Sequence, residues 1–215
     1  AWQQLQRLSN EKESAPLRHA AEVVAEDAYA REDFALARSA FELLKRTHPA
    51  EQSLARALTG LAWIAKRESR FEEAALYYQE FLDRFPDDVD VWKVRLAYAE
   101  TLAELTRVEE ARETLEPFEQ LPLDHSDRVR GLYQLALLGK EHAQWQQEST
   151  RIADALLQDY DDFELRDAVL YLTGLLHLRN GDNETSQQAF SDLADSYPQS
   201  RYWSDAVYRL AELAH

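Results

Sequence analysis

Cysteine is absent from this 215-residue chain, and so is methionine, even at position 1. Without cysteine the chain forms no disulfide and performs no thiolate chemistry, which suits either a reducing cytoplasm or an exported bacterial protein. Since methionine does not begin the chain, we expect a processed product or a fragment of a longer protein. The first ten residues, "AWQQLQRLSN", do not resemble a signal peptide. The chain also lacks an apolar run of about 18 residues, the length that a spanning helix needs.

Glycine and proline are scarce, with 5 and 6 residues. Both residues are unfavourable inside helices. Valine and isoleucine, which favour strands, are sparse beside alanine and leucine. Apolar residues make up 45% of the chain, which is enough to bury a core. The composition therefore predicts an ordered, all-α protein.

Positive charge is also in short supply. The chain has 24 lysines and arginines against 40 aspartates and glutamates, a net charge of -16. Nucleic-acid binding draws most of its affinity from basic side chains that neutralise phosphates, and an acidic surface is repelled by anionic membranes. We therefore expect neither a nucleic-acid partner nor membrane insertion.

One amphipathic segment, "RFEEAALYYQEFLDRFP", recurs along the chain with different letters. Its other copies are "DFALARSAFELLKRTHP", "RVEEARETLEPFEQLP", "QWQQESTRIADALLQDY" and "DNETSQQAFSDLADSYP". The leading apolar residues of four copies are spaced by 37, and the fifth, weaker copy follows one residue later; these leads are Phe34, Phe71, Val108, Trp145 and Asn183. Such self-similarity is the signature of a repeat protein.

Within each copy the apolar positions fall on one helix face, at 0, 3, 7 and 10 from the lead. The residue three positions after the lead is small in four copies, whereas this residue is Glu148 in the copy that begins at Trp145. The residues seven and ten positions after the lead are apolar in every copy. In chain order these pairs are Phe41 and Leu44, Tyr78 and Phe81, Leu115 and Phe118, Ile152 and Ala155, and Phe190 and Leu193. Pro49, Pro86 and Pro198 end three of the copies, because proline cannot continue a helix.

A second apolar-periodic segment precedes each copy, so each unit is predicted as helix A, a tight turn and helix B. A lone helix pair cannot bury its apolar face, and stacking buries it. We therefore predict one array over residues 1–215. Its helix pairs are expected at about 16–50, 51–88, 89–125, 126–162 and 163–199, with a last helix at 201–215.

This pattern resembles the tetratricopeptide repeat (TPR). That family places a bulky residue, Leu-Gly and Tyr in helix A, and an Ala, aromatic, Ala, Pro series in helix B. "YLTGLLHLRNGD" and "RFEEAALYYQEFLDRFP" match it best, and the resemblance covers about 15–215. It implies an all-α, right-handed α–α superhelix, or solenoid, of helix-turn-helix repeats. The small helix-A position is occupied by Ala25, Ala62, Ala99, Ala136 and Gly174, but not by Gly60 or Gly131.

The end of the chain resembles a narrower group, the bacterial periplasmic TPR proteins. These include the outer-membrane assembly lipoprotein and the factor that coordinates septal wall synthesis with the Tol system. The resemblance rests on the link "YPQSRY" followed by Asp205, Ala206 and Tyr208. It implies a periplasmic or outer-membrane-associated protein of the cell envelope, with a cytoplasmic location as the alternative.

No residue pattern predicts catalysis, a cofactor or a metal. Phosphate-binding and nucleophile motifs are absent from the sequence. Acidic pairs such as Glu72-Glu73 stand at helix starts, where they suit the helix dipole. The histidines lack metal-ligand spacing, and we predict structural or solvated roles for His19, His48, His125, His142, His177 and His215. His177 is expected in the packed core.

The TPR resemblance implies that ligands lie along helix-A positions that face away from the core. Basic and aromatic side chains share that predicted stripe, which suggests a groove for the carboxylates of an acidic or C-terminal peptide. The asparagines of the chaperone-type carboxylate clamp are absent, and ordinary solvated helix positions are the alternative interpretation. The candidate partner-binding residues are Arg56, Trp63, Lys66, Arg67, Lys93, Arg130, Tyr133, Lys140 and Tyr171.

The sequence thus predicts a non-catalytic scaffold that binds a protein or peptide in its concave groove. One alternative is a periplasmic TPR scaffold of an exopolysaccharide system, in which Trp63 and Arg67 contact acidic sugars. Another is a docking domain of an enzyme. The last helix would leave Val207, Leu210 and Leu213 partly uncovered, which predicts a weak homodimer through that helix.

Overall fold

The computed structural model describes residues 15–47 and 51–214, with side chains described from His19 onward. All regular structure in these ranges is helical. His48, Pro49 and His215, which the sequence analysis singled out, lie outside the described residues. None of the helices in the described ranges combines the length and apolarity that crossing a bilayer would require. The chain divides into two compact units between Ala111 and Arg112.

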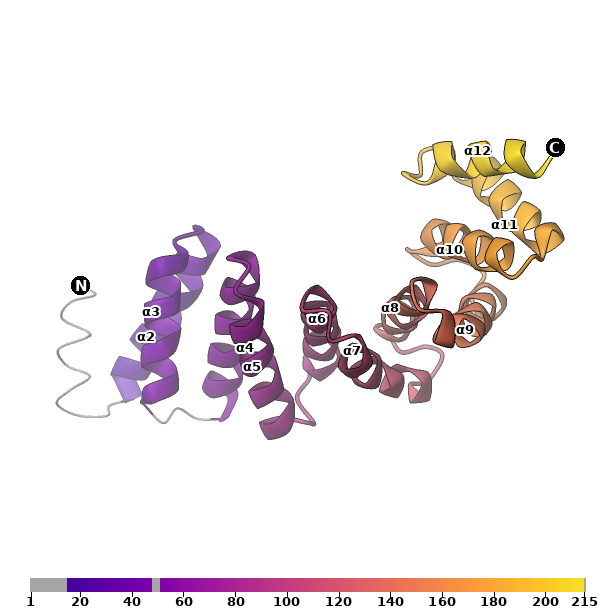
Figure 1. Cartoon of the computed structure of the whole chain (residues 1–215). Coiled ribbons are helices and arrows are strands. Elements are labelled where there is room, and N and C mark those ends of the chain that lie inside the picture. The colour runs from indigo at the N-terminus through magenta and orange to yellow at the C-terminus, as the bar shows by residue number, and fades with distance from the viewer. Residues whose placement is uncertain (1–14, 48–50, 215) are drawn as a thin grey trace. The chain divides into compact units, whose positions relative to one another are not determined.

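The first unit stacks its helices in the order of the sequence (Figure 1). Consecutive helices from α2 to α6 pack against one another, as expected of a repeat array. Its helices are α2 (Ala15–Ala30), α3 (Phe34–Arg46), α4 (Glu51–Arg67), α5 (Phe71–Arg84) and α6 (Val91–Glu104), and the boundary between the units falls within α7 (Val108–Leu115).

The second unit repeats this plan, with consecutive helices from α8 to α12 packed in turn. Two short 3-10 helices interrupt it, one directly after α7 and one directly before α9. Its elements are η1 (Glu116–Gln120), α8 (Arg128–Lys140), η2 (Ala143–Trp145), α9 (Gln146–Asp159), α10 (Arg166–Arg179), α11 (Asn183–Ser196) and α12 (Trp203–Leu213). The predicted all-α class of helical repeats is confirmed.

Most B helices begin where the repeat register places them. The structure starts α3, α5, α7 and α11 at Phe34, Phe71, Val108 and Asn183. The fourth copy is different, because η2 ends at Trp145 and α9 begins at Gln146. The lead predicted at Trp145 is therefore wrong by one residue.

A register that starts at Gln146 removes the irregularity at Glu148. The position three residues on is then Ser149, which is buried as its small counterparts are. The positions seven and ten residues on become Ala153 and Leu156, which are both buried. Of the two residues predicted there, Ile152 is also buried, whereas Ala155 is only half-buried. Ser149 fits because Gly139 faces it from α8, where a Cβ would lie 1.7 Å from the Ser149 Oγ.

The turn from helix A to helix B uses a left-handed residue in four repeats. Glu32, Ser69, Thr106 and Gly181 have φ angles of 61°, 58°, 58° and 78°. The N–H of the residue that follows donates a hydrogen bond to the carbonyl five residues earlier. For instance, the Arg107 N–H donates to the Leu102 carbonyl at 2.9 Å. This bond caps the end of helix A as in a Schellman motif.

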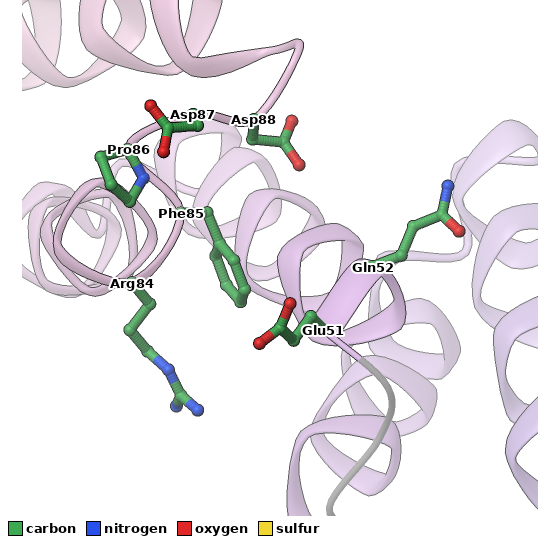
Figure 2. Close-up of a pocket in the computed structure, with 7 residues that line it drawn as sticks. All are labelled: Glu51, Gln52, Arg84, Phe85, Pro86, Asp87 and Asp88. Carbon is green, nitrogen blue, oxygen red and sulfur yellow. The ribbon is translucent and has the colours of Figure 1, made fainter.

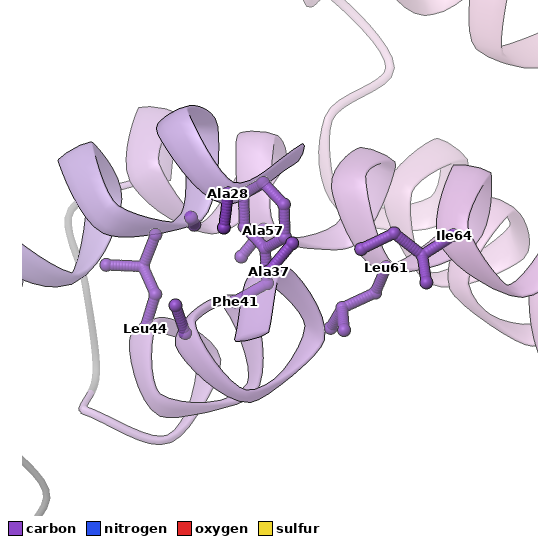
Figure 3. Close-up of a cluster of buried hydrophobic side chains, with 9 residues drawn as sticks. Ala28, Ala37, Phe41, Leu44, Ala57, Leu61 and Ile64 are labelled. Carbon is purple, nitrogen blue, oxygen red and sulfur yellow. The ribbon is translucent and has the colours of Figure 1, made fainter. Parts of the chain in front are cut away.

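The core of the first unit forms where three successive helices meet. Side chains from α2, α3 and α4 converge there, as Figure 3 shows for Ala28, Ala37, Phe41, Leu44, Ala57, Leu61 and Ile64. The ring of Phe41 lies over Gly60, where a Cβ would come within 2.5 Å of it. Gly60 therefore lets a B-helix ring approach the next A helix closely, and it also shapes the surface described below.

Candidate functional site

In the first unit, the basic side chains of the predicted groove face carboxylates of the same chain. The Arg56 guanidinium lies 2.6 Å from Glu22, and the Lys66 ammonium lies 2.5 Å from Glu100. Arg67 reaches Glu32 at 3.5 Å and lies over the Phe34 ring. Lys93 pairs with Asp90 at 2.8 Å. An acidic ligand would have to displace these carboxylates.

Two of these pairs join successive A helices at a constant spacing of 34 residues, from Glu22 to Arg56 and from Lys66 to Glu100. In the second unit Arg130 meets Glu164, also 34 residues on, at 2.5 Å, and this bond raises the pKa of Arg130. Lys140 pairs instead with its neighbour Glu141 at 3.0 Å. Opposite charges at this spacing favour the correct alignment of neighbouring repeats.

We expect Lys66 and Glu100 to be energetically coupled across the α4–α6 interface. Both side chains are partly exposed, so a double-mutant cycle of Lys66→Ala and Glu100→Ala should give about 0.2–1 kcal/mol. The coupling should fall in 1 M salt, where exposed charges are screened. Urea unfolding of the four proteins measures it, with Asp27 and Arg31, a more exposed pair at the end of α2, as the control cycle. A coupling of zero at low salt would contradict a role for this pair in repeat alignment.

Trp63 is the most exposed aromatic side chain of the candidate set, at 43%. Its indole lies 6.4 Å from the Tyr29 ring, with the two planes tilted by 41°. Beside it is a pocket of about 300 Å³, lined by Glu26, Tyr29, Phe41, Arg56, Thr59, Gly60, Trp63 and Asp90. We call this the Trp63 pocket. Its residues come from α2, α3, α4 and the residue before α6, all within the first unit.

The surface differs in charge on the two sides of Trp63. Glu26 and Asp90 line the Trp63 pocket together with Arg56, which Glu22 already engages. A shallower depression of about 470 Å³ is lined by Tyr29, Trp63, Lys66 and Arg67. The indole thus separates a pocket with two carboxylates from a depression with two cations.

A second pocket of the first unit has a different character. It measures about 370 Å³ and lies between the start of α4 and the end of α5 (Figure 2). Its aromatic side chain, Phe85, is partly buried, and its ring lies 5.6 Å from the Phe81 ring with the two planes tilted by 55°. Five of its seven lining residues are polar or charged; the lining consists of Glu51, Gln52, Arg84, Asp87 and Asp88, with Phe85 and Pro86. It offers less exposed aromatic surface than the Trp63 pocket.

The tyrosines of the predicted groove form a cluster in the second unit. Tyr171 stacks on Tyr202, with ring centroids 4.7 Å apart, and donates a hydrogen bond to Asp205. Burial and this bond raise the pKa of Tyr171 to about 12, so its phenol stays protonated at neutral pH. Tyr133 is only 8% exposed, and burial together with its hydrogen bond to Tyr202 raises its pKa. These side chains hold α12 against α8 and α10, and Tyr133 has little surface left for a ligand.

His177 lies between two carboxylates. Its Nε2 is 3.0 Å from Asp154 of α9, and its Nδ1 is 3.0 Å from Asp182, which caps α11. Hydrogen bonds from Thr185, and to a lesser degree from His177, lower the pKa of Asp182. The side chain is mostly buried as expected, but it bridges polar groups of two helices. In the described part of the chain, no three potential ligands are arranged to hold a metal.

A family model described as the tetratricopeptide repeat matches residues 25–89 and 59–117, and a second model with the same description matches residues 168–200. Together these matches cover more than half of the chain. The chain belongs to the tetratricopeptide-repeat family. This TPR protein has the helix-turn-helix repeats and apolar register typical of that family, whose fold suggests a protein–protein interaction scaffold.

Solved structures support the same fold. A tetratricopeptide repeat protein from Parabacteroides merdae superimposes with a TM-score of 0.75 at 18% identity, over 92% of this chain and 73% of that one. YrrB, described as a TPR protein with an unusual peptide-binding site, gives 0.70 at 13% identity, over 94% and 96%. Pseudomonas aeruginosa pilF gives 0.67 at 18% identity, over 91% and 83%. A search of the curated proteins found no match.

Proposed function

We propose that this TPR protein is a non-catalytic scaffold that binds a segment of a partner protein at the Trp63 pocket. The observation that carries the proposal is the exposed indole of Trp63 at the rim of an apolar-floored pocket on helix α4. Exposed tryptophans beside concave pockets are the side chains that most often dominate binding energy in interfaces.

The family and one structural relative support a peptide-sized ligand. YrrB, which is described as having a peptide-binding site, has the same fold, and its sequence is 13% identical to this chain. The Trp63 pocket has room for one or two side chains of such a segment, which would continue along the A helices. The polar groups around it, including Thr59 and Asp90, can orient the segment.

We propose a bacterial cell-envelope complex as the setting, in the periplasm or at the outer membrane. The link "YPQSRY", with Asp205, Ala206 and Tyr208 after it, supports this setting. A weak homodimer through α12 is part of the same proposal. Trp203, Val207 and Tyr208 are exposed on that helix, and Leu210 and Leu213 are partly exposed.

Replacing Trp63 with alanine is expected to weaken peptide binding by about 30-fold or more, the loss of a hot-spot side chain. Peptides selected on the full chain from a random phage-displayed library serve as ligands, and calorimetry measures their affinities. Stability should change little because the indole is partly exposed. Leu76→Ala, which truncates an exposed apolar side chain of α5, is the control and should leave affinity unchanged. Selected peptides that bind Trp63→Ala and the unaltered protein equally would refute this docking site.

A further inference from the structure

We propose that the Trp63 pocket receives a basic side chain, a lysine or an arginine, of the partner segment. This inference rests on the proposed function and specifies its ligand. It reverses the sequence-based expectation of an acidic peptide, because the carboxylates of the same chain already engage the cations of the predicted groove.

Aromatic rings form the walls and floor of the Trp63 pocket. Tyr29 and Trp63 stand at its side with their centroids 6.4 Å apart, and Phe41 lies beneath Gly60. Aromatic faces attract cations electrostatically, tryptophan most strongly, and the same faces pack against the methylene stem of a lysine or arginine. A glutamate or aspartate would gain none of this attraction.

The charges at the rim favour a cation as well. Glu26 lies 3.7 Å from Arg56, whose closer contact is Glu22 at 2.6 Å, so the Glu26 carboxylate is left largely open. Asp90 accepts a bond from Lys93 and is half exposed. The three carboxylates of Glu22, Glu26 and Asp90 outnumber the two cations of Arg56 and Lys93, which leaves the rim with one net negative charge. The whole chain, at -16, adds a long-range field that attracts basic segments.

The size of the pocket suits one long side chain. About 300 Å³ is at the lower end of the range for small-ligand sites. Because Gly60 has no side chain, the Phe41 ring packs on its backbone and contributes to the floor, although the ring is only 5% exposed. A guanidinium or ammonium group could then reach Glu26 or Asp90 while its stem contacts Trp63, which satisfies its charge with hydrogen bonds.

The test uses the 15N-labelled full chain and small probes that isolate the side chain. N-acetyl-arginine amide is titrated against N-acetyl-glutamate amide and the uncharged N-acetyl-norleucine amide. The readout is the indole N–H signal of Trp63, assigned by its absence in Trp63→Ala. We expect the arginine probe to shift this signal with an affinity at least about 5-fold higher than that of either other probe, as attraction to the ring and a carboxylate implies.

The double variant Glu26→Gln, Asp90→Asn should weaken the arginine probe about 5-fold or more and leave the norleucine probe unchanged. Glu72→Gln and Glu109→Gln, on the B helices α5 and α7, are the matched charge control and should have no effect. Equal or stronger binding of the glutamate probe, an unaltered arginine affinity in the double variant, or no shift with any probe would overturn the inference. If selected peptides still require Trp63 in that case, the proposed function stands without it.

Discussion

Replacing Phe190 with alanine is expected to lower the free energy of unfolding of the second unit by about 3–5 kcal/mol, the usual cost of deleting a buried phenyl ring. The ring is fully buried between α10 and α12, in a cluster with Leu170, Leu193 and Ala206. It packs directly on Gly174, where a Cβ would come within 2.5 Å of it. Alanine would leave a cavity that these rigid helices cannot close.

The loss should be local, because each helix of a repeat array contacts only its neighbours. Hydrogen exchange followed by mass spectrometry should show faster exchange in α10, α11 and α12 and unchanged exchange in α2 to α5. Leu76→Ala is the matched control, since Leu76 also lies on a B helix but is 67% exposed, and it should change stability by less than about 0.5 kcal/mol. Equal loss of protection in both units would contradict this local packing.

The stacking of helix pairs could be predicted from the sequence because burial imposes a period that can be counted. The apolar register located the starts of four B helices and most of their buried side chains. It failed by one residue at Trp145, because this apolar residue lies just before the first residue of α9. The signal that could have corrected it was Ser149, a small residue three positions after Gln146.

The candidate site was harder to predict, because its character depends on pairs of residues. The helix-A pattern placed Trp63 and Arg56 on one face, but it did not show which carboxylates meet the cations. Those partners lie 34 residues away, about one helical turn short of the 37-residue repeat. A search for opposite charges at the repeat length minus one turn would have found Glu22 and Glu100. The acidic side of the Trp63 pocket depends on the same three-dimensional arrangement.

Glycines outside the small helix-A position also have a role that the pattern did not show. Gly60 and Gly131 lie where the ring of a preceding B segment meets the next A helix, under Phe41 and Phe118. Without a Cβ, the two elements can approach closely enough to bury these rings. Composition alone would treat both glycines only as weak points in a helix.

Replacing Gly131 with alanine is therefore expected to destabilise the protein by about 1–3 kcal/mol, although alanine favours helix by about 1 kcal/mol. The new Cβ would lie 2.0 Å from the ring of the fully buried Phe118. The ring cannot easily retreat, because Arg128 donates hydrogen bonds to the carbonyls of Glu119 and Leu121 at 2.7 Å and so holds η1 in place. Thermal and urea unfolding of the variant measure the loss.

A compensating change separates this clash from a general effect on helix α8. Phe118→Ala removes the ring atoms that meet the new methyl group, so the double variant should lose at least about 0.5 kcal/mol less than the two single losses combined. Gly181→Ala is the control, because nothing lies near its Cβ and its cost arises from a φ of 78°. Phe118→Ala should not relieve that cost. If Gly131→Ala proved neutral, or if the losses at 118 and 131 were additive, close packing of Phe118 on Gly131 would not be what fixes η1 against α8.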